Sequence, residues 1–84
     1  MPTIHRAHGL RFVIYLDDHE PAHVHAIGAG GEAKIDIGAP GDAPNLIWTR
    51  GLSNAFVRRA VTVVRQEQVR FRAAWIDIHG RPAP

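Results

Sequence analysis

A short acidic and histidine-rich segment holds the side chains most able to do chemistry. Residues 17–25, which read DDHEPAHVH, contain three of the six histidines of the chain beside three carboxylates. Imidazole titrates near neutral pH and is also the commonest metal ligand in proteins. On a strand, His23 and His25 would point to the same face, because side chains alternate. The segment therefore indicates an acid/base centre, a metal site or a binding surface.

The same histidines open the first strand of a predicted β-hairpin. The stretches His23–Ile27 and Glu32–Ile37 flank Gly28–Gly31, a loop in which glycine can adopt positive φ. Pairing Ile27 with Glu32 across this loop sorts the apolar residues of both strands onto one face. We expect that face to pack under helices, and it carries Val24, Ala26, Ala33, Ile35 and Ile37.

The opposite, polar face of the hairpin is expected to be open to solvent or to a partner. In this register His25 faces Lys34 and His23 faces Asp36. In a catalytic centre the two histidines would transfer protons or contact phosphate, Lys34 would stabilise negative charge, and Asp36 would orient an imidazole. The cluster lacks serine and cysteine, so a nucleophilic triad is not expected. RNA can supply its own 2′-hydroxyl, so whether the chain is an enzyme stays open, and a metal-independent ribonuclease is the candidate activity. The simpler alternative is an ordinary polar sheet face with cross-strand pairs.

A metal site is the other chemical interpretation of the cluster. His19, His23 and His25 would be ligands, and one carboxylate would complete the shell: Asp17, Asp18 or Asp36. Zinc and related ions accept such nitrogen and oxygen ligands. The spacing matches no closed structural-zinc signature. A small metal-dependent hydrolase therefore stays an alternative, and the leading hypothesis involves no metal and no cofactor.

Positive charge is concentrated in the C-terminal part of the chain. Residues 1–49 hold three basic and six acidic residues, whereas residues 50–84 hold seven arginines and two acidic residues. Arg58, Arg65 and Arg72 are spaced by seven, so one straight helix would align them in a stripe. With Arg50 and Arg59 they are predicted to bind nucleic-acid phosphates or an acidic partner. The alternative is a solvated helix face.

The elements that position these side chains indicate an α+β fold, with an antiparallel sheet of four to five strands preceding the helical part. Besides the hairpin, strands are expected at Thr3–Arg6, Leu10–Leu16 and, as an edge strand, Leu46–Thr49. The helical part has an N-cap candidate in Ser53 and a C-cap candidate in Gly80, and it is either one long helix or two helices broken near Glu67. A single domain is expected over residues 1–84: mainly β over 1–49, helical over 50–80 and a tail at 81–84.

Three aromatic side chains outside the cluster have structural explanations. We expect Trp48 and Trp75 to anchor the core rather than to stack on bases, because large aromatics dominate small cores. His79 is expected to cap the last helical carbonyls, and the alternative is that it joins His23 and His25.

The composition limits where and how the chain works. No cysteine occurs among its 84 residues, which excludes disulfides and thiolate–metal sites and fits a reducing cytoplasm. No apolar run approaches the ~18 residues of a membrane span, and the first residues do not form a signal-peptide core. A domain of this size buries roughly 60–65% of its unfolded surface, so a homodimer or another partner could supply further burial.

Five segments together resemble a small bacterial family, domain-of-unknown-function family four-one-six-zero. They are Met1–Arg6, Asp18–His25, Gly31–Lys34, Arg50–Ser53 and Trp75–Gly80. The resemblance draws attention to His5, Asp18, His19, His23, His25, Glu32, Lys34, Arg50 and His79. The chain departs from the family in Gly38–Asn45, which looks longer and more flexible.

The resemblance also implies a biological setting. Such proteins are often encoded beside a second small protein, as in toxin–antitoxin modules, so a cognate small protein is the expected partner. Our leading hypothesis is a toxin-like component of this two-protein module that acts on or binds RNA. The first alternative is a non-enzymatic interaction or regulatory module that binds a protein partner or DNA. The second is the metal-dependent hydrolase.

Overall fold

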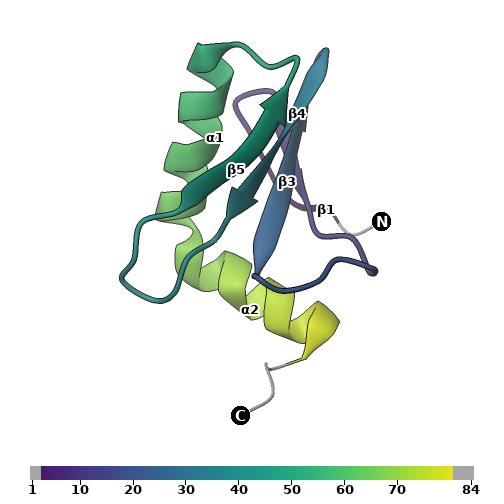
Figure 1. Cartoon of the computed structure of the whole chain (residues 1–84), viewed down its shortest axis with the longest axis vertical. Coiled ribbons are helices and arrows are strands. Elements are labelled where there is room, and N and C mark those ends of the chain that lie inside the picture. The colour runs from purple at the N-terminus through teal and green to yellow at the C-terminus, as the bar shows by residue number, and fades with distance from the viewer. Residues whose placement is uncertain (1–2, 81–84) are drawn as a thin grey trace.

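The computed structural model describes residues 3–80, which form a five-stranded antiparallel sheet followed by two helices (Figure 1). The α+β prediction is confirmed. The strands are β1 (Thr3–Ala7), β2 (Leu10–Val13), β3 (His23–Gly28), β4 (Gly31–Asp36) and β5 (Asn45–Arg50), and the helices are α1 (Asn54–Gln66) and α2 (Gln68–His79). The tail expected at residues 81–84 lies outside the described residues. Over residues 3–80, neither helix is long and apolar enough to cross a membrane.

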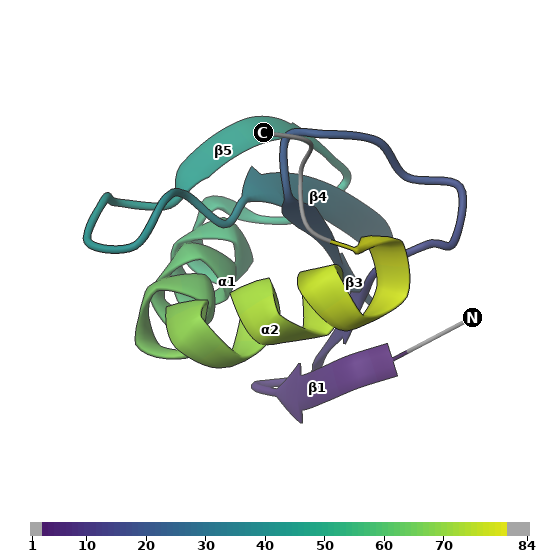
Figure 2. The same ribbon diagram turned by 90° about the horizontal axis from the view of Figure 1, so that it is seen from below.

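The sheet is a meander in which each strand pairs with the next, in the order β1-β2-β3-β4-β5. Figure 2 shows that it curves around the two helices, which cover one of its faces. The histidine-bearing strand β3 therefore lies at the centre, between β2 and β4. Strand β5 forms one edge, as its sequence predicted.

The predicted register of the β3–β4 hairpin is confirmed, with Ile27 paired to Glu32. The loop is shorter than predicted, because Gly28 also pairs with Gly31 and leaves two residues between the strands. A side chain at Gly31 is excluded by a close backbone contact. A Cβ at this position would collide with the backbone carbonyl of Arg50, where β5 ends against the hairpin tip.

Strand β2 ends earlier than predicted, at Val13 instead of Leu16. The cause is a tight turn in which the Tyr15 N–H donates to Asp18 Oδ2 at 2.9 Å and the Asp18 N–H donates to the Tyr15 carbonyl at 3.1 Å. An aspartate that captures a nearby backbone N–H competes with the strand ladder. This turn leaves Leu16 exposed and turns the Asp18 side chain back toward the sheet.

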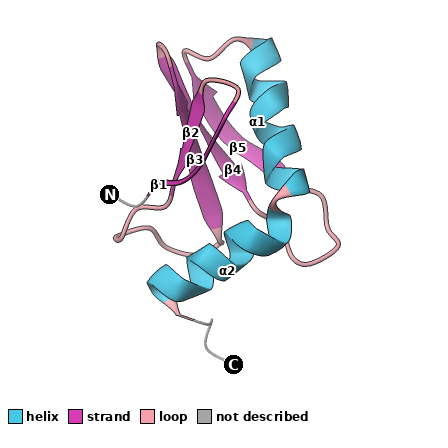
Figure 3. Ribbon diagram, turned by 180° about the vertical axis from the view of Figure 1, so that it is seen from behind, coloured by secondary structure: helices cyan, strands magenta, loops and turns pink. Residues whose placement is uncertain are grey.

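The helical part consists of two helices broken at Glu67, which was one of the two predicted alternatives. The Ser53 hydroxyl accepts the Phe56 N–H at 3.2 Å and caps α1, while Gly80 ends α2 with a positive φ of 79°. Glu67 leaves helical geometry at φ −103° and ψ 17°, and the chain changes direction there. Figure 3 shows α1 running along the strands and α2 crossing the end of the sheet.

This break corrects the predicted arginine stripe. Arg58 and Arg65 are exposed on α1, but Arg72 belongs to α2 and donates to the Gly38 carbonyl at 2.6 Å. A seven-residue spacing aligns side chains only along one continuous helix. The three arginines therefore do not form a single stripe.

The core lies between the sheet and the helices, as the apolar face of the hairpin predicted. Its largest fully buried side chains include Phe12, Ile35 and Phe71. Trp75 is a core anchor, as expected, and is 2% exposed. Trp48 is not, since it is 37% exposed and lies on the outer face of the edge strand β5.

Candidate functional site

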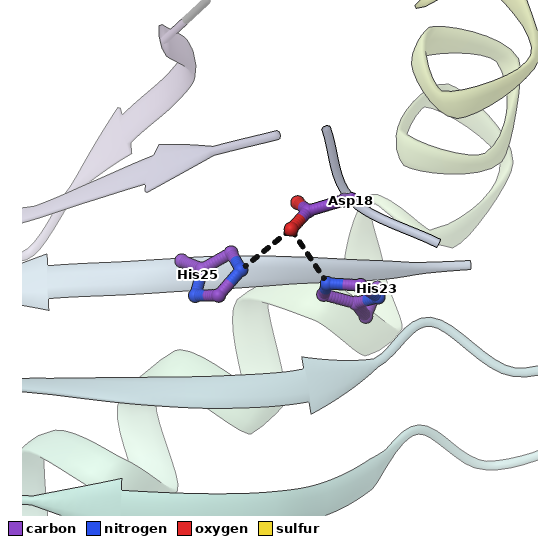
Figure 4. A group of neighbouring side chains, drawn as sticks. All are labelled: Asp18, His23 and His25. Carbon is purple, nitrogen blue, oxygen red and sulfur yellow. Dashed lines mark hydrogen bonds and ion pairs between the residues drawn. The ribbon is translucent and has the colours of Figure 1, made fainter. Parts of the chain in front are cut away.

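The loop between β2 and β3 brings one carboxylate to the two histidines of β3. Asp18 Oδ1 lies 3.3 Å from His23 Nε2 and 3.4 Å from His25 Nε2 (Figure 4). The turn at Tyr15 holds the other carboxylate oxygen, Oδ2, so only Oδ1 faces the imidazoles. We call Asp18, His23 and His25 the His–Asp cluster.

Both histidines are buried, which corrects the expectation of a polar face open to solvent. His23 is 2% and His25 7% exposed. The β2–β3 loop covers His25, whose ring centroid lies 4.6 Å from that of Tyr15. Helix α2 covers His23, whose ring centroid is 5.2 Å from that of Trp75. The register alone could not reveal this covering, because it depends on how the β2–β3 loop folds back and on α2, which is distant in sequence.

The hydrogen bonds on the far side of each ring define which nitrogen carries the proton. His23 Nδ1 donates to the Pro21 carbonyl at 2.7 Å. His25 Nδ1 donates to the carboxylate of Glu32 at 2.8 Å. A carbonyl or carboxylate oxygen can only accept, so both Nδ1 atoms are donors. In a neutral imidazole the remaining nitrogen, Nε2, is then an acceptor.

When both rings are neutral, three acceptors converge on one point. The two Nε2 lone pairs meet Asp18 Oδ1, and His23 Nε2 is fully buried with no hydrogen-bond partner in the described chain. An unpaired buried polar atom is costly and calls for a physical explanation. A proton on each imidazole or a shared cation would provide one.

The carboxylate is held in its charged form. Burial favours the neutral acid, but the Tyr15 N–H bond, the positive charge of His23 and His25 when protonated and a hydrogen bond from His25 outweigh it, so the pKa of Asp18 lies below its usual value. The phenol behaves oppositely, because burial and the neighbouring Glu32 raise the pKa of Tyr15. At neutral pH the cluster therefore offers one anionic oxygen and two imidazoles.

The two distances from Asp18 Oδ1 to the imidazoles match the ligand separations around a metal ion. Charge-assisted N–H···O bonds are usually about 2.7–2.9 Å long, shorter than the 3.3 and 3.4 Å observed. Ligand atoms of a tetrahedral zinc site lie ~3.3–3.6 Å apart when each bond is about 2.0–2.2 Å. All three ligand atoms lie within 4.8 Å of one another. Three protein ligands leave the fourth position free, which is the pattern of catalytic zinc sites.

The surroundings of the cluster also match those of metal sites. Ligating histidines usually donate their second N–H to a carboxylate or a carbonyl, which fixes the ring and the tautomer. Glu32 does this for His25, and the Pro21 carbonyl does it for His23. Divalent ions of the zinc type would suit this set of two nitrogens and one oxygen.

Two of the predicted catalytic side chains lie apart from the His–Asp cluster. Lys34 pairs with His25 across the strands, as predicted, and is partly exposed. Asp36 pairs with His23, but its Oδ1 accepts the Gly38 N–H at 2.8 Å. Within residues 3–80, no hydrogen bond joins Asp36 to an imidazole.

The third histidine of the predicted metal site also lies elsewhere. His19 is exposed and does not belong to the group of ligand atoms, and Asp18 takes that place. Sequence reasoning assigned no role to Glu32, although it is the diagonal neighbour of His25 on the same face of the hairpin. The predicted hairpin register already placed Glu32 beside His25.

His79 neither caps its helix nor joins the His–Asp cluster. The Gly80 N–H satisfies the Ile76 carbonyl. His79 Nε2 instead donates to the Tyr15 carbonyl at 3.0 Å, and its ring stacks on Trp75 at 4.2 Å between centroids. The end of α2 thus fixes the turn that presents Asp18.

The predicted basic residues divide between two sides of the molecule. Arg58, Arg59 and Arg65 are exposed on α1, which covers the apolar face of the sheet. Arg58 and Arg59 line a shallow depression with His8 beside the β1–β2 turn. Arg50 lies on the outer face of β5, the side that carries the histidines. The α1 arginines and the His–Asp cluster therefore face opposite sides.

Comparison with known proteins identifies a family but no characterised relative. A family described as "Domain of unknown function (DUF4160)" matches residues 9–76. Neither a curated protein nor a solved structure matches the chain.

Proposed function

This chain belongs to the DUF4160 family, and we propose that it is a toxin-like component of a two-protein bacterial module that hydrolyses RNA at a metal centre. The metal ligands in this proposal are Asp18, His23 and His25. The sequence left open whether the chain is an enzyme, and the enzyme it suggested was one without metal. The geometry favours the metal-dependent alternative instead.

One observation carries the metal centre: the convergence of three acceptors in a buried place. His23 Nε2 is buried without a partner, and the Nδ1 bonds hold both rings in the tautomer that a metal ion requires. A single divalent ion would satisfy all three acceptors at once. Protonating both rings would bury two cations against Asp18, and Glu32 would offer a second carboxylate to His25 alone.

The chemistry follows from the residues around the ion. A divalent ion held by Asp18, His23 and His25 would supply Lewis acidity and would lower the pKa of a bound water to near neutrality. The protein fixes the ligands through Glu32 and the Pro21 carbonyl, and it limits water access with the β2–β3 loop. Asp18 is the most exposed ligand side chain, at 13%, so substrate would approach from its side.

RNA as substrate and the toxin-like role have separate supports. Lys34 is the cross-strand neighbour of His25 and can stabilise negative charge on a phosphodiester. Arg50 lies on the same outer face. The toxin-like role rests on the family resemblance and on the paired gene arrangement that it implies.

Metal content tests the centre. Protein purified without a polyhistidine tag should bind about one equivalent of zinc or a related ion after dialysis. Asp18→Asn should abolish this binding, while His19→Ala, which removes an exposed histidine outside the His–Asp cluster, should not. Binding below about a tenth of an equivalent in the parent protein would refute the metal centre.

Activity tests the rest of the proposal. Expression without the neighbouring gene should slow growth, and co-expression of the neighbour should restore it. The purified protein should cleave RNA, and EDTA should stop the cleavage. Cleavage that persists in EDTA would establish the metal-independent mechanism instead. Harmless expression together with no cleavage by metal-loaded protein would refute the toxin-like enzyme.

The non-enzymatic alternative has one specific observation in its favour. The edge strand β5 exposes Leu46 and Ile47, at 37% and 41%, beside its unpaired backbone edge. Such edges bind partner strands. If the parent protein binds zinc and the cognate partner but never cleaves RNA, the metal centre serves a module of this kind.

A further inference from the structure

Three side chains on the outer face of the sheet form a continuous strip beside the His–Asp cluster. Lys34 of β4 lies between His25 of β3 and Trp48 of β5 in the register. Arg50 follows Trp48 by two residues, and strand alternation puts it on the same face. We call Lys34, Trp48 and Arg50 the outer strip.

Trp48 is an unusual residue to leave at the surface of this chain. It is 37% exposed, whereas the other tryptophan, Trp75, is 2% exposed. Its ring centroid lies 6.3 Å from that of His25. The guanidinium of Arg50 lies 5.6 Å from the centre of its indole. Arg50 lies over one side of the indole, and an exposed aromatic ring beside a cation is the arrangement on which unpaired bases stack in single-strand binding proteins.

The two cations of the strip are available to a ligand. Within the described residues, neither Lys34 nor Arg50 forms an ion pair with a carboxylate. Glu32, the acidic residue nearest in register, is engaged by His25 Nδ1. The strip thus presents two positive charges and one aromatic ring toward solvent. This set matches a phosphate and a base, the two recognisable parts of a nucleotide.

We propose that the outer strip binds an unpaired nucleotide of single-stranded RNA, with the base on Trp48 and the flanking phosphates on Lys34 and Arg50. The inference rests on the proposed function and names the substrate class of that site. A base inside a duplex cannot reach the indole without leaving its stack, so the strip selects single strands. The adjacent phosphodiester then lies on the side of His25.

Binding without cleavage tests this directly. Metal-free protein in EDTA is titrated into a short fluorescein-labelled oligouridylate, the matching deoxy strand and an RNA duplex. The RNA single strand should bind at least about tenfold more tightly than the duplex. Tighter binding of the ribose strand than of the deoxy strand supports RNA as the ligand. Equal or tighter binding of the deoxy strand or of the duplex overturns it.

Substitutions locate the contact. Trp48→Ala should weaken binding by about tenfold or more, and Leu46→Ala, which trims an equally exposed residue of the same strand on the opposite face, should leave it unchanged. Each of Lys34→Ala and Arg50→Ala should reduce the slope of log affinity against log salt by ~0.7. Arg6→Ala on β1 is the charge-matched control.

The outcomes separate this inference from the proposed function. Oligonucleotide binding that depends on Trp48 in a protein that binds no metal supports the strip and refutes the metal centre alone. Metal binding and cleavage that are unaffected by the three strip substitutions overturn the strip alone. Loss of self-association or partner binding in Trp48→Ala, without any oligonucleotide affinity, would make the strip a protein interface and would also overturn the inference.

Discussion

At the residue scale, the properties of the site follow from which atoms can donate. Two imidazoles on one strand face become informative only because their Nδ1 atoms are committed to the Pro21 carbonyl and to Glu32. In neutral rings, that commitment makes both Nε2 atoms acceptors facing Asp18. The same three side chains with free Nδ1 atoms could form ordinary hydrogen bonds. The residues beyond the cluster therefore decide its chemistry.

The role of Glu32 can be measured without removing a ligand. Glu32→Gln keeps the size of the side chain but removes the charge that orients His25, so zinc affinity should fall by about 10–100-fold while the protein stays folded. Asp17→Asn, which neutralises an exposed carboxylate next to the cluster, is the matched control. Titration of zinc against a competing chelator measures both. Unchanged affinity in Glu32→Gln would show that the carboxylate does not support the site.

At the element scale, loops and helix ends position the site more than the strands do. β3 fixes the spacing of the two rings, but the β2–β3 loop supplies Asp18 and covers them. The end of α2 holds that loop through the His79 bond to the Tyr15 carbonyl. The arrangement therefore depends on the break at Glu67, since α2 reaches the loop only because it turns across the end of the sheet.

The loop between β4 and β5 gives an element-scale prediction. Gln68 at the start of α2 donates to the carbonyls of Asp42 at 2.7 Å, Ile37 at 2.9 Å and Ala39 at 3.3 Å. Gln68→Ala removes these bonds and should lower the free energy of unfolding by about 1–3 kcal/mol. Proteolysis within residues 39–44 should become faster. Gln66→Ala, which changes the exposed last residue of α1, is the control. Equal effects of the two substitutions would contradict the role of Gln68.

Most of the strands and helices could be predicted from the sequence, because the signals for them are local. Alternating apolar residues and the glycine loop defined the hairpin register, and Ser53, Glu67 and Gly80 marked the helix ends. The predicted end of β2 was wrong, because the Asp18 side chain accepts the Tyr15 N–H, which the apolar pattern assigned to a strand. The β4–β5 loop, expected to be flexible, is tied to α2 by a residue 26–31 positions away.

The burial of the histidines and the exposure of Trp48 could not be predicted from the sequence, for a different reason. Both depend on which segments cover the outer face of the sheet. The β2–β3 loop and α2 cover β3 but leave β5 open. Polarity alone put the histidines outside and the tryptophan inside, and this tertiary covering reverses both.

At the scale of the whole molecule, the two faces of the sheet have different tasks. The inner face builds the core with both helices. The outer face carries the His–Asp cluster, the outer strip and an unpaired edge at β5. A chain of 84 residues has a small core and therefore a small margin of stability. A metal ion that ties the β2–β3 loop to the central strand would therefore stabilise the entire domain.

Thermal unfolding makes this measurable. A ligand that binds only the folded state at a hundred times its Kd adds about 2.7 kcal/mol, which raises the Tm of a domain this small by roughly 10–20 °C. Zinc should produce such a shift in the parent protein and in His19→Ala, and almost none in Asp18→Asn. A shift of the same size in Asp18→Asn would indicate that zinc binds elsewhere.

The most direct test of the central claim is the nitrogen NMR spectrum of the histidine side chains, recorded before and after one equivalent of zinc. After zinc, both Nε2 resonances should shift together while both Nδ1 protons are retained. Nε2 resonances of His23 and His25 that do not respond to zinc would contradict a metal centre at the His–Asp cluster.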